Sequence, residues 1–310
     1  MDFVLRKTSF MTSDNTAPAG MLYALAAYLS WGLSPLYFKL LAQVPAVEFV
    51  AHRIVWSVIL LLAVITVSRN WSRVARLVRD RRALAWLTAT TLLISVNWLV
   101  FIWAVSQDRI LEASLGYFIN PLVSVLLALI FLKEKLGRLQ SLAVGLAALG
   151  VLVAATGASG VPWVSLLLAL CFGFYGLIRK TVRAGAIDGL FVETMLILPL
   201  ALIYLLYLDQ QSQGVFARQS WRIDGLLMFS GVMTALPLMF FAAAARRLAL
   251  SLVGILQYLA PSVQFLIAVF VYDEAFGGRQ LATFALIWLG LLIFTYASFK
   301  QRRRLPQVAS

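Results

Sequence analysis

The sequence predicts an all-α membrane protein with ten transmembrane helices, arranged as two inverted repeats of five helices each. Three observations lead to this prediction. Of the 310 residues, 62% are hydrophobic and only 13% are charged, which is far from the balance of soluble proteins. The apolar residues gather in ten runs, each about as long as a membrane crossing requires. The second half of the chain also repeats motifs of the first half.

The ten apolar runs are interpreted as helices rather than strands. A helix needs about 20 apolar residues to cross about 30 Å of hydrocarbon, because it rises about 1.5 Å per residue. The runs are apolar throughout, whereas the strands of a membrane barrel alternate apolar and polar residues. The predicted spans are residues 21–41, 47–67, 83–105, 110–132, 139–156, 161–178, 187–207, 225–245, 249–272 and 280–299.

The repeat is visible in a motif that recurs 140 residues later, in which a proline within a span precedes an acidic residue and a glycine. The motif residues are Pro121, Glu134 and Gly137 in the first half, and Pro261, Glu274 and Gly277 in the second. Because each unit crosses the membrane an odd number of times, the two units are inverted relative to each other, as in many transporters. The chain then divides into a tail (1–20), a first repeat (21–156), a second repeat (161–299) and a basic tail (300–310).

The distribution of basic residues predicts the orientation. Of the 26 lysines and arginines, 20 lie in the two tails or in the connections after the second, fourth, sixth and eighth spans, and 4 lie in the other connections. Basic connections stay in the cytoplasm, so both termini are predicted to be cytoplasmic. The net charge of +13 is attributed to these connections, which meet anionic lipid heads, and not to nucleic-acid binding.

Five ionisable residues lie in or beside spans, where a charge costs at least about 2.5–3.5 kcal/mol. They are Lys39, Glu48, His52, Arg53 and Glu193. Glu48 precedes His52 by one helical turn, so the two can pair. The repeat aligns His52 with Glu193 at mirrored depths, which suits an outer and an inner gate. Because the unperturbed pKa of histidine is about 6.5, such gates could also carry protons. The alternative is that Lys39 and Arg53 snorkel to the interface and the others bond to helix ends.

The prolines predict a substrate cavity at mid-depth. Pro121 and Pro261 each remove a backbone hydrogen bond, which frees the carbonyls of Tyr117 and Gln257. Freed carbonyls at this depth require protein or a water-filled cavity to satisfy them. Ordinary packing kinks are the alternative. An aromatic cavity with few fixed charges favours neutral or zwitterionic cargo. Its predicted lining residues are Trp31, Asn97, Trp98, Tyr117, Asn120, Pro121, Tyr175, Gln257, Tyr258 and Pro261.

The sequence offers little for catalysis or for energy supply by nucleotide hydrolysis. The single cysteine, Cys171, excludes an intramolecular disulfide and a cysteine-cluster metal site. The chain has one histidine and neither an HExxH motif nor a phosphate-binding Gly-x-x-x-x-Gly-Lys motif. We therefore expect no enzymatic activity, no cofactor and no metal. The expected partners are a small-molecule substrate and the lipid bilayer, with a monomer or weak homodimer as the state of assembly.

Four segments together resemble a known family. They are AAYLSWGLSP (26–35), HRIVWS (52–57), NWLVFIWAV (97–105) and LEASLGYFINPL (111–122). They are similar to segments of the RarD-type permeases of the drug/metabolite transporter superfamily, whose repeat unit is the EamA domain. The resemblance extends from about residue 20 to 300.

The resemblance implies a ten-helix carrier of the bacterial inner membrane, built from two inverted EamA repeats around a central cavity. Alternating access would then export small metabolites or amphiphilic drugs, and proton coupling is one possible energy source. The alternative is a membrane sensor or structural protein that transports nothing, although such a protein would not need broken helices at mid-depth.

Overall fold

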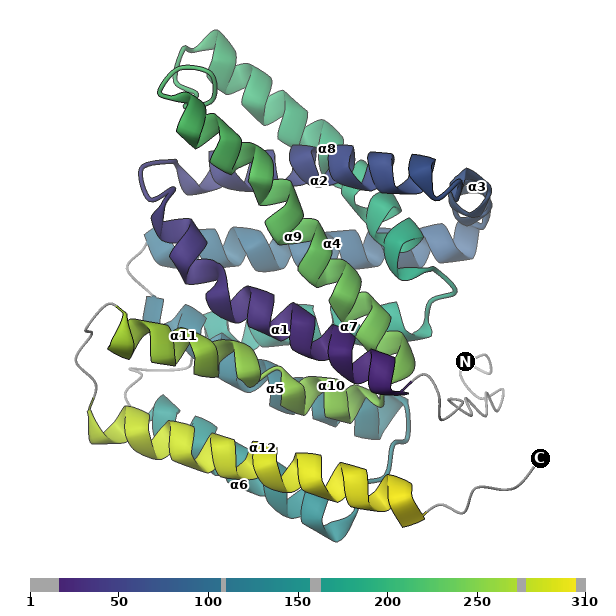
Figure 1. The fold of residues 1–310 in the computed structure, drawn as a ribbon, viewed down its shortest axis with the longest axis vertical. Coiled ribbons are helices and arrows are strands. Elements are labelled where there is room, and N and C mark those ends of the chain that lie inside the picture. Colours follow the sequence, from purple (N-terminus) through teal and green to yellow (C-terminus); the bar gives the residue numbers. More distant parts are fainter. Residues whose placement is uncertain (1–16, 107–109, 157–162, 272–276, 305–310) are drawn as a thin grey trace.

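The computed structural model describes residues 17–106, 110–156, 163–271 and 277–304, and all regular structure in these ranges is helical (Figure 1). The predicted all-α class is therefore confirmed for this part of the chain. The helices are α1 (Ala17–Lys39), α2 (Ala46–Val67), α3 (Trp71–Arg79), α4 (Arg81–Ser106), α5 (Ile110–Phe131), α6 (Arg138–Ala155), α7 (Trp163–Thr181), α8 (Ala186–Gln210), α9 (Trp221–Arg247), α10 (Leu250–Leu256), α11 (Leu259–Phe270) and α12 (Gly278–Arg304).

Eight segments in these ranges are long and apolar enough to cross a membrane. They belong to α2, α4, α6, α7, α8, α9, the α10–α11 pair and α12. The other two predicted spans overlap α1, with 23 residues, and α5, with 22 residues. That all ten segments cross the bilayer stays a prediction.

One helix, α3, lies within the basic run 69–82, which the sequence indicated only as an interfacial segment beside the lipid surface. It is only 9 residues long, too short for a span. Val74 and Leu77 are buried against the neighbouring helices, whereas the arginines of α3 are exposed. The helix thus lies across one end of the bundle, with α4 and α8 beside it (Figure 1).

Most basic residues gather at this same end, on the right of Figure 1. We call it the basic end, and define it by α3, the connection 132–137 and the last turns of α7, α9 and α12. Helix α1 begins at this end and α12 finishes there. The opposite end holds the last turns of α1, α4 and α6 and the first turn of α12.

The two halves of the chain interleave rather than forming separate bundles. Helix α1 packs against α9 and α11, α2 against α8 and α9, α4 against α7 and α8, and α5 against α7 and α10. Helices α6 and α12 pair with each other at the lower edge of Figure 1. Gly290 permits this close approach, because a Cβ there would lie 2.8 Å from the Ala143 carbonyl oxygen. The interleaving places side chains from both halves around the centre of the protein.

Candidate functional site

A cavity of about 1000 Å³ lies between the two halves of the chain. It is lined from the first half by α1, α2, α4, α5 and the last turn of α6, and from the second half by α7, α9, α11 and α12. Its lining includes Phe38 in the last turn of α1 and Arg279 in the first turn of α12. Both side chains are exposed, so the cavity extends to the end of the bundle opposite the basic end. Seven of the ten predicted lining residues lie in its wall: Trp31, Asn97, Trp98, Tyr117, Asn120, Gln257 and Pro261.

Two predicted lining residues, Pro121 and Tyr258, contribute to helix packing instead. The Tyr258 hydroxyl is buried and donates to the Phe118 carbonyl oxygen at 3.0 Å. The Pro121 carbonyl oxygen lies beside Gly254, where a Cβ would be 3.0 Å away. These contacts hold α5 against the junction between α10 and α11. Tyr175, the remaining predicted residue, lines a second and smaller cavity.

The helix is interrupted at Gln257, as predicted near Pro261, but the backbone carbonyl of Gln257 is not free. The expectation of a free Gln257 carbonyl is wrong, because the Ala260 N–H donates to it at 3.1 Å. The reason is that α10 ends at Leu256 and α11 begins at Leu259, so the backbone turns and supplies its own donor. The side chain of Gln257 still faces the cavity, and its Oε1 accepts from the Ser124 hydroxyl at 3.3 Å.

The cavity wall is mainly aromatic. The ring centroids of Trp31 and Phe172 lie 5.8 Å apart in an edge-on contact. The rings of Phe265 and Phe284 are stacked with centroids 4.0 Å apart. Such rings offer a large apolar surface and leave the polar edges of a ligand to be recognised by a few side chains.

Two asparagines provide polar groups in this aromatic wall. The Asn97 amide nitrogen donates to the Leu168 carbonyl oxygen on α7 at 3.0 Å, which fixes the orientation of the amide. The Oδ1 atom of Asn120 is buried and has no hydrogen-bond partner among the described residues. An orphaned acceptor in a cavity wall is costly unless a ligand or water donates to it.

Arg53 lies in the cavity wall, although the sequence indicated a gate residue or a snorkelling side chain. Its Nε donates to the Thr234 hydroxyl oxygen of α9 at 2.8 Å. The aromatic rings of Phe38, Phe49 and Trp98 surround the guanidinium, with centroids 5.3–5.8 Å from Cζ. A sequence signal was available, since an arginine inside a span most often faces the interior of the bundle.

Glu48 and His52 lie outside both cavities. The Val215 N–H donates to Glu48 Oε1 at 2.6 Å, and His52 Nε2 lies 3.8 Å from the same oxygen. The imidazole ring packs against Phe216 with centroids 5.0 Å apart. The expected pairing of Glu48 with His52 is thus present in the geometry, and both residues tie α2 to the connection before α9. Lys39 is exposed as the last residue of α1.

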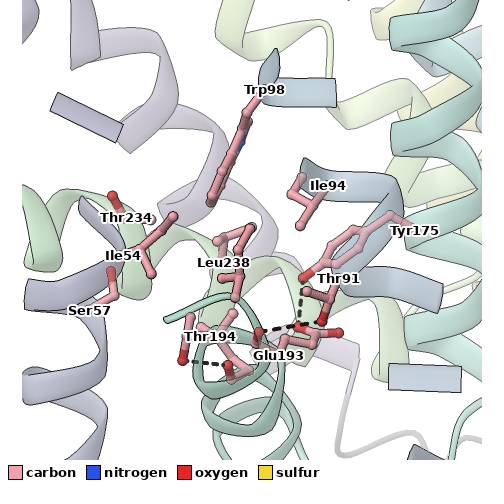
Figure 2. A pocket seen from close by; sticks show the side chains of 12 residues that line it. Ile54, Ser57, Thr91, Ile94, Trp98, Tyr175, Glu193, Thr194, Thr234 and Leu238 are labelled. Carbon is pink, nitrogen blue, oxygen red and sulfur yellow. Dashed lines mark hydrogen bonds between the residues drawn. The ribbon is translucent and has the colours of Figure 1, made fainter. Parts of the chain in front are cut away.

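Glu193 lies at the floor of a smaller cavity of about 20 Å³, with Trp98 at its other side (Figure 2). Trp98 and Thr234 line both cavities, so the smaller one continues the larger one into the protein. The Thr90 hydroxyl donates to Glu193 Oε1 at 2.5 Å, and the Tyr175 hydroxyl lies 3.4 Å from Oε2 as a second donor. Glu193 is 3% exposed, and the hydroxyls of Thr90 and Tyr175 and the guanidinium of Arg179 lie around its carboxylate.

A family model described as "EamA-like transporter family" matches residues 18–156. An "Uncharacterized transporter" of Vibrio cholerae serotype O1 is 46% identical over 94% of this chain and 97% of its own length. "Protein RarD" of Escherichia coli K12 is 44% identical over 92% of this chain and 96% of its own. The chain belongs to the EamA-like transporter family as a RarD-type permease.

Two further comparisons place this RarD-type protein among more distant relatives. A "Chloramphenicol-sensitive protein RarD" of Pseudomonas aeruginosa is 36% identical over 92% of this chain and 96% of its own length. One solved crystal structure matches with a TM-score of 0.69 at 18% identity, covering 92% of this chain and 99% of that one. At that identity the match shows the fold alone. Together with the eight apolar spans, the family establishes a multi-pass membrane protein.

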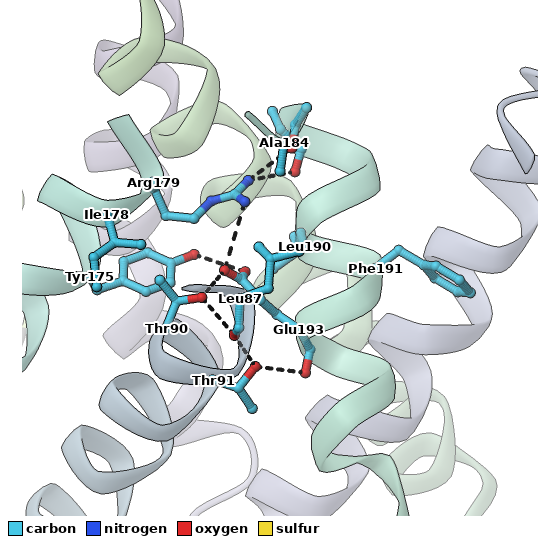
Figure 3. Close-up of polar contacts among 12 residues, drawn as sticks. Leu87, Thr90, Thr91, Tyr175, Ile178, Arg179, Ala184, Leu190, Phe191 and Glu193 are labelled. Atoms are coloured by element: carbon cyan, nitrogen blue, oxygen red, sulfur yellow. Dashed lines mark hydrogen bonds and ion pairs between the residues drawn. The ribbon is translucent and has the colours of Figure 1, made fainter. Parts of the chain in front are cut away.

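Arg179 is the side chain of this RarD-type protein that the sequence did not single out. It is fully buried, and its Nη1 lies 3.7 Å from Glu193 Oε1 (Figure 3). Its Nη2 donates to the carbonyl oxygens of Gly185 and Ala186, each at 3.1 Å. Gly189 leaves room for the guanidinium, because a Cβ there would overlap Nη1. In the sequence, Arg179 was counted among the basic residues that follow the sixth span, so a buried contact with Glu193 was not predicted for it.

The basic end of the RarD-type protein is closed by contacts between segments far apart in sequence. The Glu134 carboxylate accepts hydrogen bonds from the N–H groups of Leu250 and Ser251 at 2.8 and 3.1 Å. The Lys180 ammonium donates to the carbonyl oxygens of Ala245 and Leu248. The large cavity therefore reaches one end of the bundle, while tight polar contacts occupy the other.

Proposed function

We propose that this RarD-type permease is a secondary carrier that exports small metabolites or amphiphilic drugs by alternating access. The observation that carries the proposal is the cavity of about 1000 Å³ between the two halves, whose described lining residues extend to the end of the bundle opposite the basic end. A carrier needs a site that is accessible from one side at a time, and a cavity of this size holds a drug-sized molecule. The relatives named as transporters also support transport rather than catalysis.

We further propose that ten helices span the membrane as two inverted repeats, 21–156 and 161–299. The packing supports this. When each helix of a contact between the halves is replaced by its equivalent in the other repeat, the resulting pair of helices is also in contact. Helix α1 packs against α9, and their equivalents under the repeat, α7 and α4, also pack together. The α2–α9 contact is matched in the same way by α4–α8. Inverted repeats produce this pattern around a pseudo-two-fold axis in the membrane plane.

The basic end is proposed to face the cytoplasm of a bacterial cell, with the protein in the inner membrane. Basic connections are retained on the cytoplasmic side during insertion. In that orientation both chain termini are cytoplasmic and the cavity reaches the outer face. The structure would then correspond to the state from which an exported molecule leaves.

Proton coupling, if present, is proposed to use Glu193 rather than His52. Glu193 lines the smaller cavity that adjoins the larger one, whereas His52 lines neither. In proteoliposomes with an imposed pH gradient, Glu193→Gln should then remove the effect of the gradient on flux, and His52→Ala should preserve it. Equal responses of both variants and the unchanged protein would show that transport is not coupled through these residues.

Counterflow in proteoliposomes tests the carrier itself. Metabolite profiles of cells that lack or overproduce the protein would identify cargo, and the name of the Pseudomonas relative makes chloramphenicol a first probe. Radiolabelled cargo should accumulate transiently in vesicles preloaded with unlabelled cargo, without nucleotide. A non-transporting sensor would bind the same cargo and show no counterflow.

A matched pair of variants connects the flux to the cavity. Ala260 lines the large cavity, so Ala260→Trp should fill part of it and lower the counterflow at least about tenfold. Ala285 is exposed on α12 outside the cavity lining, so Ala285→Trp should keep the flux. Equal flux in both variants would contradict transport through this cavity.

A further inference from the structure

We infer that the cavity of this RarD-type protein binds an organic anion, a carboxylate joined to an aromatic or other apolar body, with Arg53 as the group that holds the carboxylate. The inference rests on the proposed function, since it takes the cavity as the transport site. It replaces the expectation of neutral or zwitterionic cargo, because Arg53 puts a fixed positive charge in the cavity wall.

The charge of the cavity wall is the first observation. Among the described residues that line the cavity, Arg53 and Arg279 are cationic and none is Asp or Glu. Within the same part of the chain, no carboxylate lies within ion-pair distance of Arg53. Because an unbalanced cation in a site of low dielectric attracts an anion strongly, the wall favours negatively charged ligands over cationic ones.

The orientation of the guanidinium is the second observation. Its Nε donates to Thr234, which fixes the plane of the group. No hydrogen-bond acceptor among the described residues contacts Nη1 or Nη2, and the residue lines the cavity. Two parallel N–H donors of this kind match the two oxygens of a carboxylate, and such bidentate pairs are among the strongest polar contacts in proteins.

The rings around Arg53 explain why the cation persists there without an acidic partner. The centroids of the Phe38, Phe49 and Trp98 rings lie 5.8, 5.6 and 5.3 Å from its Cζ. Cation–π contacts of this kind stabilise the guanidinium but leave its positive charge in place. The charge therefore remains available to a ligand, which a salt bridge within the protein would have prevented.

The aromatic wall identifies the rest of the ligand. Trp31, Phe172, Phe265 and Phe284 line the same cavity as Arg53. An inorganic anion would leave these rings in contact with water, whereas an aromatic carboxylate covers them and places its charged end at Arg53. Asn120 lines the same cavity and adds a polar amide to its aromatic wall.

Equilibrium binding to the purified full-length protein in detergent tests the inference with three probes of nearly equal shape. The probes are naphthalene-2-carboxylate, naphthalene-2-carboxamide and 2-naphthylmethylammonium, titrated by calorimetry. The carboxylate is expected to bind at least about tenfold more tightly than the carboxamide, and the ammonium more weakly than both. Equal affinities for carboxylate and carboxamide in the unchanged protein would overturn the inference.

Variants assign the preference to Arg53. Arg53→Gln is expected to make the carboxylate bind no more tightly than the carboxamide, and to leave the carboxamide affinity within about twofold. Arg76→Gln is the matched control, because Arg76 is an exposed arginine of α3 at the basic end. It should keep the full preference. A preference that survives Arg53→Gln, or one that Arg76→Gln removes equally, would place anion binding elsewhere.

A second variant covers the case in which Arg53→Gln does not fold. Thr234→Val keeps the shape and the charge of the site but removes the acceptor that orients Nε. It should lower the preference for the carboxylate about threefold to tenfold, and an unchanged preference would contradict the role of Arg53. These measurements need no transport, so absent counterflow with intact anion binding would refute the carrier alone. Counterflow with no anion preference would refute the ligand class alone.

Discussion

Glu134 and Ser251 join the two halves of the protein at the basic end. The Ser251 N–H and hydroxyl both donate to Glu134 Oε2, at 3.1 and 2.6 Å, and the Leu250 N–H donates to Oε1 at 2.8 Å. The carboxylate thus occupies the start of α10, where backbone N–H groups have no partner within the helix. Glu134 follows α5 in the first half, and Ser251 lies at the start of α10 in the second half. This contact therefore links the two halves at the basic end.

Removal of this carboxylate should loosen the basic end. Glu134→Ala is expected to cost about 2–4 kcal/mol of folding free energy, since hydrogen bonds to charged groups contribute about 1.5–3 kcal/mol each and are not additive. Thermal unfolding of the purified protein measures the loss. With Cys171→Ala as background, the buried reporter Leu252→Cys should also react faster with a maleimide when Glu134 is absent.

The neighbouring residue Lys135 supplies the control for that experiment. It is exposed in the same connection, so Lys135→Ala should change neither the unfolding temperature nor the rate of labelling. Unchanged labelling in Glu134→Ala would mean that the contact does not restrict access at the basic end.

The buried hydroxyl of Tyr258 gives a smaller and more local prediction. It donates to the Phe118 carbonyl oxygen at 3.0 Å and is fully buried, so Tyr258→Phe removes this hydrogen bond between α5 and the helix junction. The expected loss is about 0.5–1.5 kcal/mol of unfolding free energy. Tyr207 is 55% exposed on α8, and Tyr207→Phe should have no measurable effect. Similar changes in both variants would show that the Tyr258 bond does not stabilise the helix junction.

The sequence predicted the helices well because the membrane imposes their length and composition. Each of the ten apolar runs overlaps a helix, and the α10–α11 junction falls in a run that was predicted to be broken near Pro261. Helix α3 was indicated only as an interfacial segment and not as a helix, since its 9 residues are too few for a span and lie in a basic connection. Length and hydropathy therefore identify membrane helices but not the short helices that lie across their ends.

The site was harder to predict, because the direction of a side chain depends on distant packing. Arg53 faces the cavity where Thr234, 181 residues away, accepts its Nε hydrogen bond. Glu193 was predicted as a gating or proton-coupling residue, but its partner Thr90 comes from another helix, and nothing in the sequence singled Thr90 out. The place of each residue along its helix was readable from the sequence, whereas the distant residue that its side chain contacts was not.

Close helix packing at Gly231 yields a prediction with a control in the same helix. A Cβ at Gly231 would lie 2.5 Å from the Trp56 carbonyl oxygen and 2.7 Å from the Ser57 nitrogen, both backbone atoms of α2. Gly231→Ala should therefore force α2 and α9 apart and cost about 1–3 kcal/mol. Nothing lies within 4 Å of a Cβ at Gly225. Gly225→Ala should thus be neutral or stabilise by up to about 1 kcal/mol, as helix propensity predicts. Thermal unfolding of the two variants compares them directly.

The contact between Arg179 and Glu193 provides the last prediction. Both side chains are buried, with Arg179 Nη1 3.7 Å from Glu193 Oε1. Loss of one partner leaves the other charge buried without compensation, which typically costs about 3–5 kcal/mol. Glu193→Gln and Arg179→Gln should each lower the unfolding temperature strongly, although the Thr90 hydroxyl and the Gly185 carbonyl retain partial partners for the remaining group.

The double variant decides whether the pair acts as a unit. If the cost of each single variant is that of an uncompensated charge, Arg179→Gln with Glu193→Gln should be less destabilised than the sum of the two by at least about 1 kcal/mol. The exposed pair of Asp209 and Arg218 is the control, because it is closer, at 2.5 Å, but is hydrated. The corresponding cycle there should give a coupling energy of only about 0–1 kcal/mol. Additive effects at Arg179 and Glu193 would instead mean that each charge is held by its own hydrogen bonds, and that the protein can separate the two without a large cost.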